Sequence, residues 1–472
     1  MPSIYHVVPH LGGGVGRVLM NLIHESCKNK NNEFDHYIIC FENANNSAIQ
    51  WGKRTGIKIW HNILPANPQL DFLLSKADIV HIHFRNHPLI YRFFTNQNLP
   101  EFRTVIWSHV NGHEAPQKIT KNVLDYPDIF VFSTKYSEDI LPLKAFDNRR
   151  ETKRLRTIFV SSGFEHVKDV IRIPHEGFNI GYIGTVDYCK IHRHFIKICN
   201  SVNIPDVKFI VCGGNDHEQL KYEAKSSKAH NIFEIKGPVK DICSELAVFD
   251  LFGYPLAKGH YGTGEQALIE AMSIGVVPVV LDNGPERHII RHNYTGIVAG
   301  TETEYIAALE YLYHHPDQRE KLSCNAKQYA SEYYDITKTV DAWYEIYCEL
   351  MTIPKSSHSF VGMEEYSPNT DIGTKLFILS LGDSYEAKVY RHALETANIE
   401  SFSTRKVVLE ELASLPPIFY SASRGSVYHY YSYWQESKGL KYLCYITKEA
   451  EKYKKGNIDE NEKSFLSKLS IM

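Results

Sequence analysis

Near its start the chain reads Ile4-Tyr-His-Val-Val-Pro-His-Leu-Gly-Gly-Gly-Val-Gly-Arg-Val-Leu-Met-Asn-Leu-Ile23. Residues 4–8 form a short, largely apolar run, which predicts a strand, and from residue 15 onward the apolar side chains recur at helical spacing. A strand that passes through a glycine-rich turn into a helix is the unit from which parallel sheets covered by helices are built.

This alternation of strand and helix continues through most of the chain. Short β-branched or aromatic runs predict further strands at residues 36–40, 79–82, 104–107, 129–132, 158–160, 180–183, 208–211, 251–254 and 276–281. The pattern predicts an α/β protein with two units, each a parallel sheet with helices on both faces. Two facing sheets of this kind would place the active site in the cleft between them.

The chain is divided into four parts. Residues 1–165 and 166–335 are expected to form two α/β domains, and residues 336–352 a helix that packs back toward the first domain. Residues 353–472 form an α-rich accessory extension without an assigned role. Its Tyr-rich run, residues 419–434, is either a small aromatic core or a platform on which sugars stack.

Length and composition exclude several classes of protein. A chain of 472 residues suggests about three domains. The hydrophobic share of 43% and the charged share of 23% are those of a globular protein, and the net charge of −3 gives no basic bias toward nucleic acid. The longest apolar stretch, residues 274–281, contains a proline and is far shorter than the roughly 20 residues that span a bilayer.

The cysteines and the first residues indicate a compartment. Nine cysteines without a CxxC pair are typical of free thiols in a reducing environment. Residues 1–8 lack the basic region and the cleavage site of a secretory signal. We therefore expect a cytoplasmic protein.

Three segments could carry chemistry. Gly13, Gly14 and Arg17 lie in the turn between the first strand and helix, which is either an anion-binding loop or simply a tight turn. Gly184 ends a strand, and Lys190 and Arg193 follow it. These two cations could clamp a diphosphate, although the spacing alone favours a solvated basic loop.

The third segment begins a helix. Thr263 and Gln266 fit a capping box, and the free amides after Gly264 would suit a phosphate or a sugar hydroxyl. The ordinary interpretation of Glu265 is compensation of the helix dipole, and that of Glu270 is a surface glutamate.

These segments resemble the retaining glycosyltransferases of family four, which have the GT-B fold of two facing Rossmann-like domains. The resemblance covers about residues 1–350. It rests on Gly12–Gly16, Asp78-Ile-Val-His81-Ile-His83, Ser108-His109-Val-Asn-Gly112, Gln266-Ala-Leu-Ile-Glu270 with the residues up to Val280, Gly284-Pro-Glu286, and Thr295-Gly296.

The resemblance implies a role for individual residues. Glu270 matches the second member of the family's glutamate pair, which holds the ribose hydroxyls of the nucleotide. Lys190 matches the lysine that binds the donor diphosphate. Gly13 and Gly14 match the loop near the donor phosphate, and His109 matches the histidine beside the transferred sugar.

The sequence departs from the family at two positions. The first glutamate of the pair would stand eight residues before the second, where this chain has Gly262. Glu265 is the candidate to take over its contact with the sugar. The family's arginine five residues before the lysine is Thr185 here, so neutralisation of the diphosphate would rest on Lys190 with Arg17 or Arg193.

The expected activity is transfer of a sugar, with retention of configuration, from a nucleotide-diphosphate sugar to a glycan or lipid-linked acceptor in cell-surface polysaccharide or lipopolysaccharide synthesis. The expected donor is a UDP-sugar, and no cofactor is expected. The chain contains no Asp-x-Asp motif, which agrees with a metal-independent reaction. Two alternatives remain open: an epimerase or phosphorylase on the same fold, and a non-catalytic binding subunit.

Two further features bear on metals and membranes. The pairs His81/His83 and His192/His194 have a spacing that zinc can use on a strand. No carboxylate or cysteine cluster with ligand spacing accompanies them, so we expect no metal site. The basic run 149–156 is either a solvated loop or a contact with the inner membrane, which would make the protein peripheral.

Overall fold

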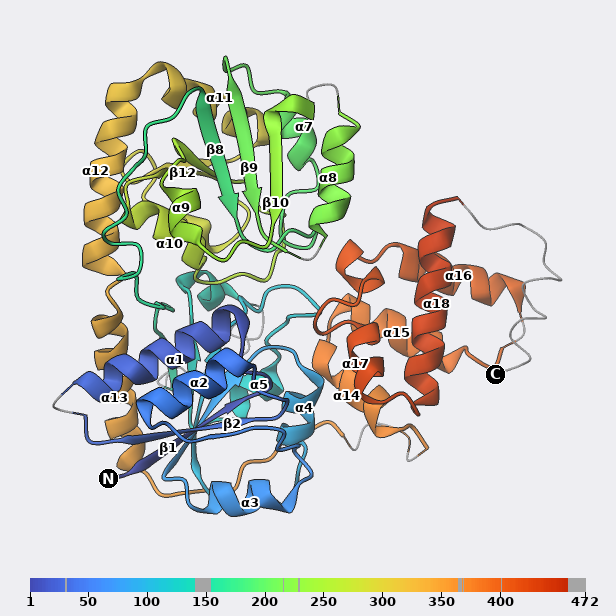
Figure 1. The fold of residues 1–472 in the computed structure, drawn as a ribbon. Helices are drawn as coiled ribbons and strands as arrows, with labels where there is room; N and C mark the ends of the chain where they lie inside the picture. The colour runs from blue at the N-terminus through green and yellow to red at the C-terminus, as the bar shows by residue number, and fades with distance from the viewer. Residues whose placement is uncertain are drawn as a thin grey trace.

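A computed structural model describes residues 1–29, 32–140, 154–214, 216–227, 230–363, 367, 369–399 and 401–456. Two all-parallel sheets form the centres of two domains (Figure 1). The first has the order β3-β2-β1-β4-β5-β6-β7 and the second β10-β9-β8-β11-β12-β13. The strands are β1 Ser3–Val8, β2 Asp35–Cys40, β3 Ile59–Trp60, β4 Ile79–Phe84, β5 Arg103–Ser108, β6 Ile129–Phe132, β7 Leu155–Thr157, β8 Phe178–Ile183, β9 Val207–Cys212, β10 Phe233–Gly237, β11 Leu251–Tyr254, β12 Val277–Leu281 and β13 Ile297–Ala299.

Helices cover both sheets. Those of the first domain are α1 Gly13–Lys28, α2 Asn46–Thr55, α3 Pro68–Ser75, α4 Pro88–Phe94 and α5 Lys121–Asp125. Those of the second are α7 Phe195–Asn200, α8 His217–Lys225, α9 Ile242–Leu246, α10 Gln266–Ser273, α11 Glu302–His314 and α12 Pro316–Tyr333. The predicted α/β class, with two facing parallel sheets and a helical C-terminal region, is confirmed.

Helix α13, Ile336–Met351, returns the chain to the first domain (Figure 1). Its buried Trp343 and Tyr347 pack with Trp107 and the other apolar side chains on that face of the first sheet. The chain therefore crosses between the domains twice, once after β7 and once between α12 and α13.

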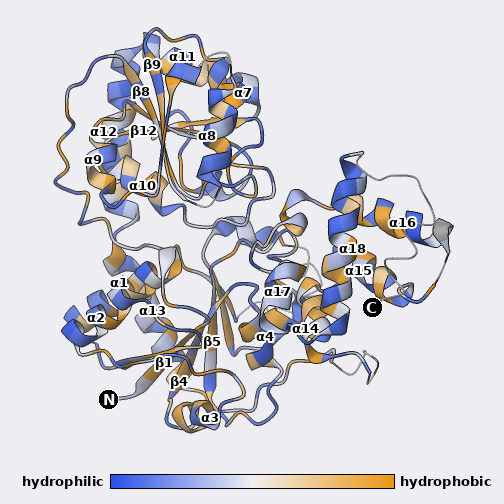
Figure 2. Ribbon diagram, turned by 45° about the vertical axis from the view of Figure 1, so that its right-hand side comes forward, coloured by the Kyte–Doolittle hydropathy of each residue, from blue (hydrophilic) through white to orange (hydrophobic). Residues whose placement is uncertain are grey.

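The C-terminal extension shares its core with the first domain. Its helices are α14 Ile372–Leu381, α15 Tyr385–Glu395, α16 Phe402–Ala413, α17 Val427–Tyr433 and α18 Lys438–Lys454. Phe377 and Tyr430 belong to the same buried cluster as Phe84 and Ile90 of the first domain. Figure 2 shows hydrophobic residues where α14 and α17 meet α4. Tyr430 is fully buried, so at least this part of the Tyr-rich run is core.

The structure differs from the predicted strands at the sheet edges. The expected strand 158–160 lies outside β7, which ends at Thr157 because its partner β6 ends at Phe132. Ile158 N still donates to Phe132 O at 2.9 Å, and the side chains of Ile158 and Val160 are buried with those of α13. Strands β3, β10 and β13 were not predicted. All three are edge strands of two to five residues, with little room for an alternating pattern.

Candidate active site

The candidate residues follow the carboxyl ends of strands in both sheets. Gly13 comes after β1 and His109 directly after β5, while Lys190 comes after β8 and Glu265 after β11. In Figure 1 the arrows of β8, β9 and β10 point toward the first domain. Ligands of parallel α/β folds bind beyond these strand ends, so the space between the domains is the candidate site.

One side chain of the first domain joins the facing loop directly. The Nδ2 atom of Asn111 donates to the carbonyl oxygens of His260 and Gly262, at 2.5 and 3.1 Å. Asn111 is buried by this contact. The two domains are thus in contact beside Gly262, at the position where the family resemblance expects a glutamate.

Lys190 and Glu265 form a buried ion pair. Lys190 Nζ lies 2.5 Å from Glu265 Oε1, and Tyr254 donates its hydroxyl to Oε2 of the same carboxylate at 2.7 Å. Burial opposes the charge on Lys190, but the carboxylate of Glu265 outweighs it and raises the pKa of Lys190. Burial would likewise raise the pKa of Glu265, but Lys190 and then His260 lower it. Both groups are therefore charged at neutral pH.

The glycine at position 262 makes room for this pair. A Cβ atom there would lie 1.8 Å from Glu265 Oε1 and 2.7 Å from Lys190 Nζ. The carboxylate of Glu265 therefore occupies the space that a side chain at 262 would enter. Although Glu265 stands three positions later in the chain, its carboxylate lies where the Cβ atom of a side chain at 262 would lie.

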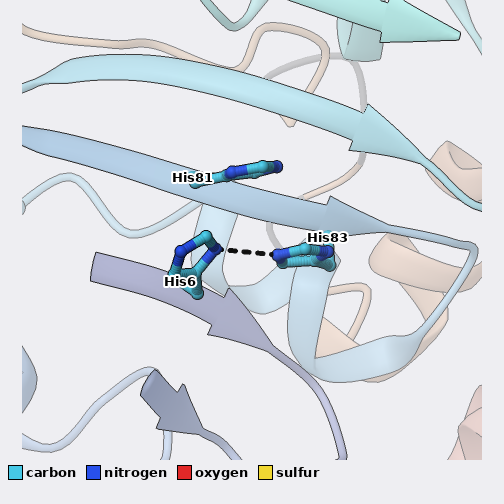
Figure 3. A group of neighbouring side chains, drawn as sticks. All are labelled: His6, His81 and His83. Carbon is cyan, nitrogen blue, oxygen red and sulfur yellow. Dashed lines mark hydrogen bonds between the residues drawn. The ribbon is translucent and has the colours of Figure 1, made fainter. Parts of the chain in front are cut away.

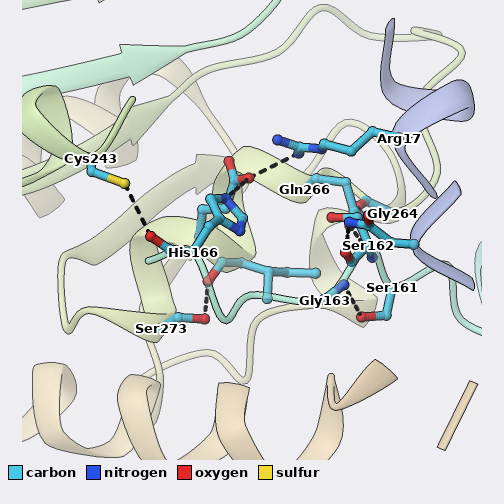
Figure 4. A network of polar contacts seen from close by, with 12 residues as sticks. Arg17, Ser161, Ser162, Gly163, His166, Cys243, Gly264, Gln266 and Ser273 are labelled. Carbon is cyan, nitrogen blue, oxygen red and sulfur yellow. Dashed lines mark hydrogen bonds and ion pairs between the residues drawn. The ribbon is translucent and has the colours of Figure 1, made fainter. Parts of the chain in front are cut away.

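Glu270 is buried and joins the two domains. Arg17 Nη2, from α1, and His166 Nε2 both approach Glu270 Oε1, at 2.9 and 3.0 Å (Figure 4). Its side chain is only 2% exposed. The interpretation of Glu270 as a surface glutamate is therefore wrong. The reason is that its turn of α10 lies between the second domain and the incoming helix α1 of the first.

Gly13 and Gly14 begin α1 beside open space. Gly13 has φ +60°, which favours glycine, and a Cβ atom at either residue would meet no atom within 4 Å. The N-cap residue, Gly12, offers no side chain to the first amides of the helix. These amides and the positive end of the helix dipole are available to an anion.

The start of α10 differs from the predicted capping box. Its N-cap is Glu265, and neither Thr263 nor any other side chain caps it. Gln266 instead donates to the carbonyl of Val160, at 2.7 Å, and to that of Gly264. The capping-box prediction is wrong because Gln266 serves the contact between the domains. Thr263 is buried in the same turn.

Gly184 and Gly264 lie in places where a side chain has little room. A Cβ atom at Gly264 would lie 2.0 Å from Val160 Cγ1, and one at Gly184 would lie 3.1 Å from the hydroxyl of Tyr182. That hydroxyl donates to the carbonyl of Thr185 at 2.7 Å. Gly184 therefore lies beside the tyrosines that surround Glu265, and Gly264 lies at the domain contact.

Arg193 is not brought together with Lys190. Arg193 is exposed, whereas Lys190 is buried beneath the loop. Nearby, His192 and His194 lie 3.8 and 2.8 Å from Glu302 at the start of α11. No carboxylate cluster with ligand spacing accompanies this histidine pair in the sequence, but the fold brings Glu302, which is 108 residues from His194 in the chain, beside it.

His109 is the last ring of a buried group of histidines. Its Nε2 lies 2.9 Å from His83 Nδ1, and His83 Nε2 lies 3.1 Å from His6 Nδ1 (Figure 3). His81, stacked on His83, contacts the hydroxyl of Tyr347 at 2.9 Å instead. Burial lowers the pKa of His109 to about 3, so the ring is neutral at pH 7.

A cavity of about 530 Å³ opens where the two domains and the extension meet. Glu114 of the first domain, Tyr188 and Tyr261 of the second, and residues 416–418 of the extension belong to its wall. Lys190 Nζ lies 5.6 Å from the centre of the Tyr261 ring. The side chain of Tyr261 therefore lies between the cavity and the buried ion pair.

Sequence reasoning missed several residues of the site. Tyr254 could have been found, because it ends a predicted strand of the second sheet. His166 stands in a segment without periodicity and carried no signal. His260 and Glu286 belong to two separate segments that only the fold brings together, with His260 Nε2 2.8 Å from Glu286 Oε1.

Residues 149–153 of the basic run lie outside the described residues. Arg154 and Arg156, which are described, are paired with Asp125 and Glu349, at 2.7 and 3.1 Å. Among the described helices, none combines the length and the apolar character needed to cross a membrane.

Comparison with known proteins finds one family model for part of the chain. Residues 164–329 match the family model of glycosyl transferases group 1. A search of curated proteins finds no match.

Several solved structures share the fold at low sequence identity. A glycosyltransferase from Rickettsia africae has a TM-score of 0.59 and 14% identity, and covers 75% of this chain and 99% of its own. HepE from Anabaena, in complex with UDP and glucose, has a TM-score of 0.57 and 13% identity, over 74% and 100%. WaaG, a glycosyltransferase involved in lipopolysaccharide biosynthesis, has a TM-score of 0.52 and 13% identity, over 73% and 99%. At these identities the likeness concerns the fold alone.

Proposed function

We propose that the protein moves a sugar from a nucleotide-diphosphate sugar to an acceptor, with retention of configuration and without a metal ion. The proposal is supported by the match of residues 164–329 to the family model of glycosyl transferases group 1 and by the fold shared with the glycosyltransferase from Rickettsia africae. The observation that carries the proposal is the charged Lys190, held beside Glu265 at the carboxyl ends of the strands. An ammonium in this place suits a diphosphate leaving group.

The nucleotide would bind against the second domain, with its ribose hydroxyls on Glu270. Arg17 now holds that carboxylate from the first domain. When the ribose hydroxyls replace Arg17 at Glu270, the guanidinium of Arg17 becomes free to turn toward the diphosphate. UDP is the nucleotide we favour, because HepE, with the same fold, was solved with UDP and glucose.

Charge explains the reaction. Breaking the bond between the anomeric carbon and the diphosphate oxygen leaves negative charge on the nucleotide and positive charge on the sugar ring. Lys190 and the free amides at Gly13 and Gly14 would stabilise the first, and the carboxylate of Glu265 the second. In this proposal Glu265 takes over the sugar contact of the residue missing at 262.

The acceptor would bind in the cavity beside Tyr261. Its wall combines aromatic rings, a carboxylate and the apolar residues 416–418 of the extension, a mixture that suits a sugar ring with both apolar and hydroxyl faces. We propose a glycan or lipid-linked acceptor of cell-surface polysaccharide or lipopolysaccharide synthesis, used by a cytoplasmic enzyme at the inner membrane. The solved structure of WaaG, from lipopolysaccharide biosynthesis, supports that context.

The donor proposal is tested by thermal stability across nucleotide diphosphates and their sugars. One selective ligand should raise the melting temperature, because a ligand at a hundred times its Kd stabilises by about 2.7 kcal/mol. Glu270→Gln should weaken that ligand about ten- to hundredfold, since hydrogen bonds to a charged group contribute about 1.5–3 kcal/mol. Glu320→Gln, an exposed glutamate of the same domain, is the control. Equal binding by both variants contradicts the proposed site.

Product analysis then separates transfer from other chemistry. Nucleotide released only with an acceptor supports transfer, whereas conversion of the sugar without an acceptor indicates an epimerase and overturns the proposal. Ile418→Trp, which narrows the cavity, should raise KM for the acceptor and leave KM for the donor unchanged. Val407→Trp, at an exposed position of α16, is the matched control.

A further inference from the structure

A line of buried imidazoles crosses the first sheet. His36 is on β2, His6 on β1 and His83 on β4, and His109 directly follows β5, so the four rings come from four neighbouring strands. The strand registers place the four histidines on one face of the sheet. The residue paired with each histidine on the neighbouring strand lies two positions from the next histidine, and residues two positions apart on a strand point to the same face. That face is covered by α1 and α13.

Hydrogen bonds connect the rings without a gap. Ser26 Oγ lies 3.1 Å from His36 Nε2, and His36 Nδ1 lies 2.9 Å from His6 Nε2. His6 Nδ1 lies 3.1 Å from His83 Nε2, and His83 Nδ1 lies 2.9 Å from His109 Nε2. Each of the three inner rings uses both nitrogens within the line. His109 uses Nε2, which leaves its Nδ1 for a ligand.

A neutral imidazole has one N–H donor and one bare acceptor nitrogen. Every ring in the line must therefore donate in the same direction, because a reversal would set two N–H groups or two lone pairs against each other. Only two arrangements satisfy all four contacts. In one, every ring carries its proton on Nδ1, and His109 Nδ1 is a donor. In the other, every ring carries it on Nε2, and His109 Nδ1 is an acceptor.

The rings are neutral and shielded from water. His6, His36 and His83 are buried. Burial lowers the pKa of His36 to about 4, and it holds the pKa of His6 and of His83 well below the usual value. A fixed charge inside the line is therefore costly, whereas a change between the two neutral arrangements leaves no net charge behind.

We propose that Ser26, His36, His6, His83 and His109 form a proton relay between the interdomain cleft and the far side of the first domain. The inference rests on the proposed function and on the family resemblance, which implies that the transferred sugar lies beside His109. At the other end, Ser26 and His36 line a recess of about 10 Å³, close to the space that one water molecule needs. The relay switches His109 Nδ1 from acceptor to donor.

The transfer balances at each bond. When the acceptor oxygen bonds to the anomeric carbon, its proton goes to His109 Nδ1. The Nε2–H bond of each imidazole then breaks as the next Nδ1–H bond forms, in the order His109, His83, His6, His36. Finally His36 gives its Nε2 proton to Ser26 Oγ, which releases its own proton to water. The sugar–phosphate bonding pair leaves with the diphosphate.

The first test measures tautomers and needs no activity. In protein labelled with ¹⁵N at the histidine rings, the nitrogen shifts distinguish Nδ1–H from Nε2–H. We expect His36, His6, His83 and His109 to share one tautomer, or one average of the two. Different tautomers within the line overturn the relay.

The second test separates proton transfer from packing. His83→Gln keeps a hydrogen-bonding group but cannot exchange tautomers. We expect the single-turnover rate to fall at least about tenfold, within the range of acid–base catalysis, with an unchanged KM for the donor and loss of the solvent deuterium isotope effect. His81→Gln is the matched control, because His81 is equally buried on the same strand but is bonded to Tyr347. A smaller decrease, or an equal decrease in both variants, overturns the relay.

The two proposals fail separately. If no sugar is transferred from any donor while the four rings share one tautomer, the proposed function is wrong and the hydrogen-bonded line remains. If transfer proceeds while the tautomers differ, the relay is wrong and the proposed function remains.

Discussion

Replacing Glu265 by glutamine removes one charge from an ion pair whose two side chains are 9% and 5% exposed. Tyr254 can still donate to the new amide oxygen, but the ammonium of Lys190 loses its counterion at 2.5 Å. Loss of one partner of a buried pair costs about 3–5 kcal/mol. For a domain of this size we expect a melting temperature about 6–20 °C lower.

The assay is thermal and urea unfolding at pH 7.5, with a double variant as control. Lys190→Met/Glu265→Gln leaves no unpaired charge. Its loss in the free energy of unfolding should therefore be at least about 1 kcal/mol smaller than the sum of the losses of the two single variants. UDP should stabilise Glu265→Gln more than the unsubstituted protein, because its diphosphate supplies the missing negative charge. If Glu265→Gln unfolds within about 1 kcal/mol of the original protein, the reasoning from buried charge is refuted.

The pH dependence of this difference has a definite sign. The pKa of Glu265 is lowered, so its contribution is present above pH 4.5 and is lost as the pH falls through the folded pKa. The pKa of Lys190 is raised, so its contribution is present below pH 10.5 and is lost as the pH rises through the folded pKa. As the pH rises above neutral the difference between the two proteins should shrink, because burial lowers the pKa of Lys190 once Glu265 no longer opposes it.

Three further predictions concern packing, the extension and acid. Gly264→Ala should lower both stability and transfer, because its Cβ would lie 2.0 Å from Val160 Cγ1; calorimetry and activity at the same temperature check this. Tyr430→Phe removes a 2.8 Å hydrogen bond to the buried Oδ1 of Asn86 and should cost about 1–3 kcal/mol in urea unfolding, with an unchanged value counting against the shared core. The lowered pKa of His36 means that the unfolded state binds more protons below pH 6.5, so its contribution falls by about 2 kcal/mol from pH 7.5 to pH 5. His36→Gln should therefore lose less stability over that range than the unsubstituted protein.

Local patterns were enough to predict the class of fold. The strands of both sheets that bury apolar residues on both faces, such as β6 and β12, appear as short continuous runs. Edge strands such as β3 do not, because a strand of two half-buried residues has no pattern of its own. Strand–helix alternation therefore identified two parallel sheets but not their full width.

The family resemblance singled out Lys190 and Glu270. Spacing alone favoured a solvated loop for the first and a surface glutamate for the second. It misjudged the environment of Glu270, since the groups that surround this carboxylate come from residues 17 and 166. It also placed Arg193 beside Lys190, whereas the turn of the chain exposes one and buries the other.

The sequence by itself determined the α/β class and the loops that follow the strand ends, because both depend on neighbours a few residues apart. Only the tertiary structure decided that Glu265 enters the space left by Gly262. It also decided that four histidines from distant segments form one line, and that the extension completes the core of the first domain. These features depend on strand order and domain contact, which join groups 30 to 300 residues apart, and spacing along the chain does not record such distances.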